Sequence, residues 1–361
     1  MEKMVKDNLI ELYKGRRILV TGHTGFKGSW LVKYLEFLGA IVFGYSLNNT
    51  SNINHHTLLE KDDKNEMIGD ILDYELLRKS FEEFQPEIVF HLAAQALVRE
   101  SYNNPVDTYQ VNVIGTANVL NVIRSCKSVK SVICITTDKV YENKEWDYAY
   151  REIDQLGGHD PYSSSKACCE LLINSYRNSY FNPNDFGIKH EVIISTARAG
   201  NVIGGGDWSK DRLIPDIVVA AMNGEKVKIR NGTSIRPWQH VLDCLNGYII
   251  LGSKLIERNV QYGTSWNFSP YINQTQNVMN IVKLASQEWN KIDYEVSLCK
   301  NNPHEAKNLM LDNSKAIREL DWHPIWNTEE AIQKTIIWYR EFYENNKILT
   351  DSQILQFLNQ Q

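Results

Sequence analysis

Two groups of reactive side chains lie close together near the middle of this 361-residue sequence. Thr137, Asp138 and Lys139 come directly after S-V-I-C-I-T, an apolar run of the kind found in buried strands. Tyr162 and Lys166 begin a segment whose apolar residues recur at helical spacing. Because they are four residues apart, their side chains share one face of that helix. The pattern therefore predicts a strand end and a helix start that carry one reactive site.

The pair formed by Tyr162 and Lys166 is suited to accept the proton of an alcohol. A free phenol has a pKa of about 10, and a nearby ammonium together with a cofactor's positive charge lowers it toward neutrality. The phenolate takes the proton while hydride leaves the same carbon for a nicotinamide. The spacing Y-x-x-x-K alone is common on helix surfaces, so the prediction also depends on the preceding threonine and on a glycine turn. We expect the Thr137 hydroxyl to bind the same substrate oxygen as Tyr162.

A glycine-rich turn lies between an apolar strand and an amphipathic helix near the N-terminus. The sequence I-L-V-T-G-H-T-G-F-K-G places Gly22, Gly25 and Gly28 at this turn. Glycine lets the backbone approach a pyrophosphate, and the helix N-terminus offers free N–H groups. The spacing G-x-x-G-x-x-G differs from the commonest dinucleotide fingerprint. The next strand ends at Ser46 without a carboxylate for a ribose hydroxyl or an arginine for a 2′-phosphate, which leaves NAD and NADP both open.

Strands and helices continue to alternate through the first 199 residues. This alternation predicts an α/β fold of the Rossmann type, a doubly wound parallel sheet covered by helices on both faces. Ligands bind such sheets beyond the carboxyl ends of the strands. We therefore expect one crevice to be lined by the residues at these ends, which are Gly22, Asp70, Ala93, Ala94 and Thr137.

The pattern becomes less regular after the strand E-V-I-I-S-T-A-R. We expect residues 1–203, with a returning segment at about 238–270, to form the NAD-binding domain. Residues from about 204 to 237 and from 271 to 361 are expected to form a smaller α/β domain that binds the substrate. The candidates for returning strands are R-P-W-Q-H-V-L-D and S-W-N-F-S, and E-E-A-I-Q-K-T-I-I-W-Y-R-E-F predicts a late helix.

Composition excludes several classes of function. The net charge is −5 and the sequence contains no cluster of basic residues, which argues against nucleic acid as a partner. The polar N-terminus and the lack of an apolar run of about 18 residues predict neither a signal peptide nor a membrane span. No C-x-x-C pattern occurs, so we expect buried free thiols in a reducing cytoplasm, and no histidine spacing predicts a metal site. His55 and His56 are expected in a polar loop; the cysteines are Cys126, Cys134, Cys168, Cys169, Cys244 and Cys299.

Long motifs resemble the extended short-chain dehydrogenase/reductases that act on nucleotide sugars. They include T-G-H-T-G-F-K-G-S-W, A-A-Q-A-L-V-R-E-S-Y, T-T-D-K-V-Y-E-N-K-E-W, G-G-H-D-P-Y-S-S-S-K, R-A-G-N-V-I-G-G-G-D-W and I-R-P-W-Q-H-V. The resemblance covers about residues 14 to 342 and is strongest to the 4,6-dehydratases of the CDP-glucose branch. It implies a tightly held NAD, a nucleotide-sugar substrate and a place in deoxysugar biosynthesis for surface polysaccharide. It also implies a homodimer or tetramer built on the helix of Tyr162 and the run after Pro105, with Leu171, Leu172, Val119 and Ile123 as candidates for its contacts.

The resemblance also implies a catalytic set and an order of steps. The set is Thr137, Asp138, Lys139, Tyr162 and Lys166; relatives acting on dTDP-glucose carry Asp-Glu after the threonine, whereas this chain carries Asp-Lys. Tyr162 takes the C4 hydroxyl proton while NAD⁺ takes the C4 hydride. The resulting 4-ketone acidifies the C5 proton, and water leaves from C6 with Asp138 donating a proton to the departing hydroxyl. The stored hydride then returns to C6. Three roles for Lys139 remain open: a neutral C5 base, a charged stabiliser of the enolate, or a simple partner of Asp138.

Binding residues are implied on both sides of the reacting carbon. For the cofactor they are Gly22, Thr24, Gly25, Phe26, Lys27, Gly28, Asp70, Ile71, Leu92, Ala93, Ala94, Gln95 and Asn112, together with Tyr162 and Lys166. For the substrate they are Gln95, Arg99, Asn201, Arg212 and Arg236, of which Arg236 is the expected diphosphate ligand. We expect His91 to be a hydrogen-bonded core residue and Trp208 and Trp238 to serve packing.

Three alternative functions compete with this interpretation. One is a 4,6-dehydratase of another nucleotide hexose, such as dTDP-glucose or GDP-mannose. A second is a nucleotide-sugar 4-epimerase or 4-dehydrogenase, against which Asp138 and Lys139 argue. A third is a non-catalytic NAD-sensing scaffold, which the intact set of Thr137, Tyr162 and Lys166 makes a poor explanation.

Overall fold

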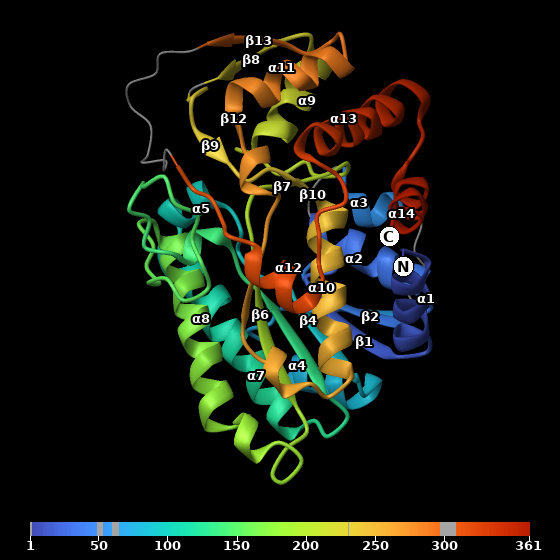
Figure 1. The fold of residues 1–361 in the computed structure, drawn as a ribbon, viewed down its shortest axis with the longest axis vertical. Helices are drawn as coiled ribbons and strands as arrows, with labels where there is room; N and C mark the ends of the chain where they lie inside the picture. Colours follow the sequence, from blue (N-terminus) through green and yellow to red (C-terminus); the bar gives the residue numbers. More distant parts are fainter. Residues whose placement is uncertain (1, 49–52, 60–64, 230, 297–307) are drawn as a thin grey trace.

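A seven-stranded parallel sheet forms the centre of the computed structural model, which describes residues 2–48, 53–59, 65–229, 231–296 and 308–361 (Figure 1). Its strand order is β11-β6-β5-β4-β1-β2-β3, and every pairing is parallel. The strands are β1 (Arg17–Thr21), β2 (Ile41–Ser46), β3 (Glu66–Ile68), β4 (Ile88–His91), β5 (Ser131–Ile135), β6 (Ile193–Ala199) and β11 (Ser265–Phe268). The chain order reverses direction between β1 and β4, and such a switch point is where α/β sheets bind ligands.

Helices cover both faces of this sheet, as the alternating pattern predicts. Along β1, Ile18 and Val20 belong to one apolar cluster and Leu19 to the other, because successive side chains of a strand point to opposite faces. The first cluster is covered by α1 (Glu2–Tyr13), α2 (Phe26–Phe37) and α10 (Val241–Ile256). The second is covered by α4 (Tyr74–Phe84), α7 (Gly115–Ser125) and α8 (Pro161–Ser179). The predicted fold class is confirmed.

A second group of elements gathers at the upper end of the molecule in Figure 1. They include α9 (Leu213–Asn223), α11 (Val278–Glu288) and α13 (Thr328–Asn345), and the paired strands β8 (Lys226–Ile229) with β13 (Asp293–Val296) and β9 (Ile235–Arg236) with β12 (Gln276–Asn277). Lower down, α12 (Ser314–Leu320) packs near β11, and α14 (Thr350–Leu358) packs on α2 beside α3 (His55–Leu58). The predicted late helix is α13.

Only one of the two predicted returning strands joins the sheet. β11, from S-W-N-F-S, pairs with β6 and forms an edge. β10 (Gln239–His240), from R-P-W-Q-H, pairs instead with β7 (Val202–Ile203) outside the central sheet. The prediction for β10 was wrong because β11 already occupies the sheet edge beside β6, while the chain that leaves β6 offers β10 a separate partner.

The run after Pro105 does not form one continuous α-helix. α5 (Val98–Asn103) and α6 (Pro105–Tyr109) lead into a π-helical turn, Gln110–Ile114, before α7 begins. π-helical turns are rare and occur often at functional sites. Here the turn contains Asn112, a predicted cofactor ligand. Among the described helices, none has the length and apolar character that crossing a bilayer requires.

Candidate active site

The two reactive groups of the sequence do meet in the structure. β5 ends one residue before Thr136, and Asp138–Val140 form a 3₁₀ turn directly after Thr137. α8 starts at Pro161, where the Asp160 side chain caps it by accepting from the Ser163 N–H at 2.9 Å. Proline in the first turn and a capping carboxylate favour this helix start. Tyr162 is hydrogen-bonded to Thr137, so the strand end and the helix start share one site.

Tyr162 is a buried phenol in this structure. Burial raises its pKa to about 12, although the hydrogen bond to Thr137 opposes the shift. The Lys166 ammonium donates to the Ile135 carbonyl at 3.2 Å, and burial lowers the pKa of this lysine. The expected lowering of the phenol pKa by Lys166 is therefore not seen in the protein alone, because burial disfavours the charged form of both groups.

Asp138 is the most enclosed acid of the site, with 2% of its surface exposed. Its Oδ1 accepts from the Thr137 hydroxyl at 2.9 Å, and its Oδ2 is buried without a hydrogen-bond partner among the described residues. Burial raises the pKa of Asp138, against the opposing charges of Lys139 and Arg236. A raised pKa favours the protonated acid, which is the form that can donate a proton. Lys139 itself is half-buried.

The glycine turn has the shape that a dinucleotide requires. Gly22 has a φ of 76°, and a Cβ on it would lie 2.7 Å from the Ala93 nitrogen. A Cβ on Gly28 would lie 2.1 Å from the Gly22 carbonyl oxygen, so this glycine lets α2 pack onto the turn. Gly25 is exposed, and no side chain caps the first N–H groups of α2 that follow it. The N-terminus of α2 therefore presents backbone donors where a pyrophosphate would fit.

The other predicted cofactor ligands follow the neighbouring strands. Asp70 and Ile71 come after β3, and Leu92, Ala93, Ala94 and Gln95 come after β4. Asn112 connects this edge to α8, because its Oδ1 accepts from the Gln95 N–H at 2.8 Å and its Nδ2 donates to the Ser165 hydroxyl at 2.8 Å. Thr24 bonds the Ser46 hydroxyl at 2.8 Å, at the end of β2. The structure thus gathers these residues at one edge of the sheet.

Lys27 lies closer to the candidate catalytic residues than the sequence indicates. Its ammonium donates to the Tyr248 hydroxyl at 3.2 Å. Burial lowers its pKa, and the charges of Lys166 and Asp138 are near enough to contribute to the shift. Lys27 therefore stands between the glycine turn and the catalytic set.

The predicted substrate ligands come from the loops above the sheet. The Arg212 guanidinium binds Asp207 at 3.0 Å, and its charge acts on the pKa of Tyr162. Arg236 donates to the Ile235 carbonyl at 2.8 Å, and its charge acts on Asp138. Asn201 begins the connection to β7. Arg99 is less central, because it forms an ion pair with Asp211 at 2.8 Å on the surface of the loop before α9.

His91, Trp208 and Trp238 have the packing roles that the sequence predicts. His91 is buried and bonded to Thr21 at 2.7 Å and Thr116 at 3.0 Å, and burial lowers its pKa to about 3. Trp208 packs against aromatic rings of α13, and Trp238 is buried in the core. Five cysteines carry free thiols, whereas Cys299 lies outside the described residues.

His55 and His56 begin the buried helix α3, so the prediction that they lie in a polar loop was wrong. Asn54 caps this helix and His55 bonds Ser29 and Thr350, which draws both rings inward.

A buried ion pair behind the catalytic helix was not predicted. Glu170 lies one turn after Lys166 and binds the Arg198 guanidinium through both oxygens at 2.8 Å. Thr136, the residue before Thr137, donates to Glu170 at 2.6 Å. The pair therefore fixes α8 against the ends of β5 and β6. The spacing of Tyr162, Lys166 and Glu170 at four-residue intervals is the signal in the sequence that could have indicated it.

A Rossmann sheet, a glycine turn and a threonine–tyrosine–lysine set at the ends of its strands define the class of nicotinamide-dependent enzymes with a short-chain dehydrogenase fold. Residues 19–335 match the family model described as GDP-mannose 4,6 dehydratase, so the chain belongs to that family. It is similar to a CDP-glucose 4,6-dehydratase of Salmonella typhimurium, with 46% identity covering 93% of this chain and 94% of that protein. A dTDP-glucose 4,6-dehydratase of Haemophilus influenzae is 28% identical, and the match covers 89% of this chain and 97% of that protein.

Solved structures share the whole fold. An epimerase from Methanothermobacter thermautotrophicus superposes with a TM-score of 0.81 at 26% identity, covering 95% of this chain and 97% of that one. A dTDP-glucose 4,6-dehydratase from Bacillus anthracis, solved in complex with NAD, has a TM-score of 0.74 at 23% identity. The match covers 91% of this chain and 98% of that one. Both confirm the Rossmann-type architecture.

Proposed function

We propose that this protein is an NAD-dependent hydro-lyase that converts CDP-D-glucose to CDP-4-dehydro-6-deoxy-D-glucose. The observation that carries the dehydratase assignment is the enclosed carboxyl of Asp138, which touches Thr137 directly beside Tyr162. An epimerase needs only the oxidation set, whereas elimination also needs a proton donor for the leaving hydroxyl. The similarity to the Salmonella CDP-glucose enzyme over nearly the full length of both chains supports the choice of nucleotide.

Each residue of the site has a separate task in this reaction. Tyr162 takes the proton of the C4 hydroxyl, and Thr137 holds the same oxygen. Lys166 anchors the helix start to the Ile135 carbonyl and supplies positive charge beside the phenol. Bound NAD accepts hydride from C4 and returns it to C6 within one turnover. Asp138, protonated because it is buried, donates to the hydroxyl that leaves C6.

The cofactor and the substrate would bind to different groups of residues around the candidate catalytic set. The glycine turn, Asp70, the residues after β4 and Asn112 would hold the dinucleotide along the sheet edge. Arg212 and Arg236 carry fork-shaped guanidinium groups that suit a diphosphate. We assign residues 1–203 with about 238–270 to the cofactor domain, and about 204–237 with 271–361 to the substrate domain. A cytoplasmic location agrees with the free thiols.

Incubation with a panel of nucleotide sugars tests this assignment. We expect CDP-glucose to give a 4-keto-6-deoxy product, detected by its absorbance in alkali and by mass loss of one water. dTDP-glucose, UDP-glucose and GDP-mannose should react at least about 10-fold more slowly in kcat/KM, which is the discrimination that one or two polar contacts supply. Preferred turnover of GDP-mannose or a UDP-sugar would contradict the substrate assignment, and epimerised but undehydrated product would contradict the reaction.

Lys139→Met is expected to slow proton removal at C5. Lys139 follows Asp138 in the same 3₁₀ turn, so it can reach the carbon next to the one that loses water. We expect exchange of the C5 proton with solvent deuterium to fall by about 10²-fold, the usual effect of losing a base or a charge stabiliser. Lys144→Met, which removes an exposed lysine paired with Glu142, is the control. Unchanged exchange would show that Lys139 only pairs with Asp138.

We propose further that the protein is a homodimer built on α6 and α8. These two helices lie side by side, and they expose Val106 (65%) and Leu171 (59%). Val106, Tyr109, Ile114 and Cys168 line an apolar groove between them. Exposed apolar patches of this kind mark protein interfaces. Val119 and Ile123, which we expected on this face, are instead buried in the core between α7 and the sheet.

The double substitution Val106→Glu and Leu171→Glu is expected to convert the dimer to a monomer, because it places four like charges in a two-fold interface. Sedimentation velocity should show the halved mass. Ile188→Glu is the matched control, since this residue is 81% exposed in the loop after α8 and does not line the groove. A wild-type monomer, or a dimer that survives the double substitution, would contradict the proposed interface.

A further inference from the structure

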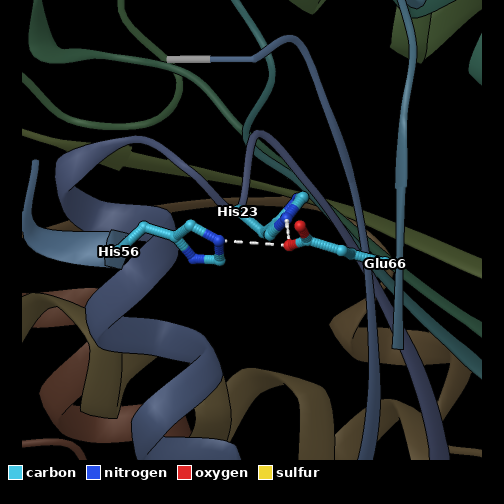
Figure 2. A group of neighbouring side chains, drawn as sticks. All are labelled: His23, His56 and Glu66. Carbon is cyan, nitrogen blue, oxygen red and sulfur yellow. Dashed lines mark hydrogen bonds and ion pairs between the residues drawn. The ribbon is translucent and has the colours of Figure 1, made fainter. Parts of the chain in front are cut away.

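Three side chains from separate segments meet beside the glycine turn. Figure 2 shows His23 and His56 directed at one carboxylate oxygen of Glu66. The His23 Nε2 lies 2.6 Å from Glu66 Oε2, and the His56 Nε2 lies 3.1 Å from the same oxygen. The three ligand atoms all lie within 4.8 Å of one another. No spacing in the sequence predicts this cluster, because its members are far apart along the chain.

A neighbouring residue helps to position each of the two histidines. A Cβ on Gly44 would lie 2.4 Å from the His23 ring, so the absence of a side chain at this position of β2 makes room for the histidine. His56 is the second residue of α3, where its backbone N–H donates to the capping Asn54 side chain at 2.9 Å. The two rings stand nearly perpendicular, with centroids 5.0 Å apart. The geometry at Glu66 is therefore set partly by β2 and α3, neither of which carries a candidate catalytic residue.

The cluster is shielded from water. The side chains of His23, His56 and Glu66 are 2%, 8% and 17% exposed. Two imidazole nitrogens and one carboxylate oxygen are a ligand set that Zn²⁺ accepts, with bonds of about 2.0–2.2 Å and a fourth position for water. Hard cations such as Mg²⁺ and Ca²⁺ prefer oxygen ligands alone, so the two imidazoles select a borderline metal.

We propose that His23, His56 and Glu66 form a structural site for Zn²⁺ or a similar borderline divalent cation. The cation would link the glycine turn after β1, the helix α3 and the strand β3. Its three ligands are not among the candidate catalytic residues, and the proposal does not depend on the proposed reaction.

Metal analysis of the full chain tests the site. Protein stripped with a chelator and titrated with Zn²⁺ should bind about one equivalent per chain. Zn²⁺ should also raise the midpoint of thermal unfolding, because a ligand that binds only the folded state stabilises it. Co²⁺ in place of Zn²⁺ should give the intense visible bands of a four-coordinate site.

His56→Gln and Glu66→Gln should each abolish the stoichiometric binding, the thermal shift and the Co²⁺ bands. His323→Gln, which removes an exposed histidine bonded to Tyr271, should change none of them. Absence of saturable Zn²⁺ binding to the wild-type chain would overturn the proposal, as would binding that both variants retain. If one variant fails to fold, the other variant and the wild-type Co²⁺ spectrum decide the outcome.

Discussion

Replacing Asp138 with Asn is expected to stop dehydration while leaving oxidation of the substrate intact. The change keeps the size of the side chain and its contact with Thr137 but removes the donated proton. Loss of a general acid costs about 10²–10⁴-fold in rate, so we expect product formation to fall by this factor. In a single turnover with CDP-glucose, the absorbance of reduced nicotinamide should build up, because hydride taken from C4 has no acceptor at C6.

The pH dependence of the elimination rate tests the same role of Asp138. Burial raises the pKa of Asp138, and only its protonated form donates. The elimination rate of the wild-type protein should therefore fall as the pH rises through this raised pKa, and the variant should lack that dependence. Asp147→Asn, which changes an exposed carboxylate in the loop after the same 3₁₀ turn, is the control. Wild-type rates in Asp138→Asn would contradict the role of this acid.

Replacing Arg198 with Met is expected to destabilise the fold by about 3–5 kcal/mol, the usual cost of leaving one member of a buried ion pair alone. Arg198 and Glu170 are each 3% exposed. Burial alone would raise the pKa of Glu170, but the Arg198 charge and the hydroxyls of Thr136 and Thr196 reverse the shift and lower it. Urea unfolding at neutral pH measures the loss.

An exposed ion pair provides the comparison for Arg198. Lys130 binds Glu191 with both side chains more than 40% exposed, so Lys130→Met should cost far less stability than Arg198→Met. Because the pKa of Glu170 is lowered in the folded protein, its contribution is present above the unfolded pKa and is lost as the pH falls through the folded value. A loss below about 1 kcal/mol in Arg198→Met would show that Thr136, Thr196 and Ser265 hold the carboxylate without the guanidinium.

Sequence reasoning predicted that the candidate catalytic groups meet, because they stand on regular elements. A strand end and a helix start have few possible geometries, so these elements, taken with the glycine turn, predicted that Thr137 and Tyr162 lie together. Glycines at the turn after β1 were equally informative, since Gly22 and Gly28 leave no room for a side chain. The parallel order of the strands then brought Asp70, Ala93 and Asn112 to the same edge.

The features that were missed depend on contacts between distant segments. Glu170 and Arg198 are separated by 28 residues, and only the pairing of β6 with β5 brings Arg198 under α8. β10 is too short for its pattern to reveal that it pairs with β7. His23, His56 and Glu66 converge because α3 folds back on the turn, and no periodicity describes that path. The raised pKa of Tyr162 likewise follows from burial, which spacing does not report.

The most direct test of the central claim uses CDP-glucose labelled with deuterium at C4. If the protein performs a 4,6-dehydration with NAD held throughout the turnover, the label should leave C4 and appear at C6 of the 4-keto-6-deoxy product in the same molecule. Mixing labelled and unlabelled substrate should give no crossover. Retention of deuterium at C4, or its appearance in free reduced nicotinamide, would contradict the proposed function.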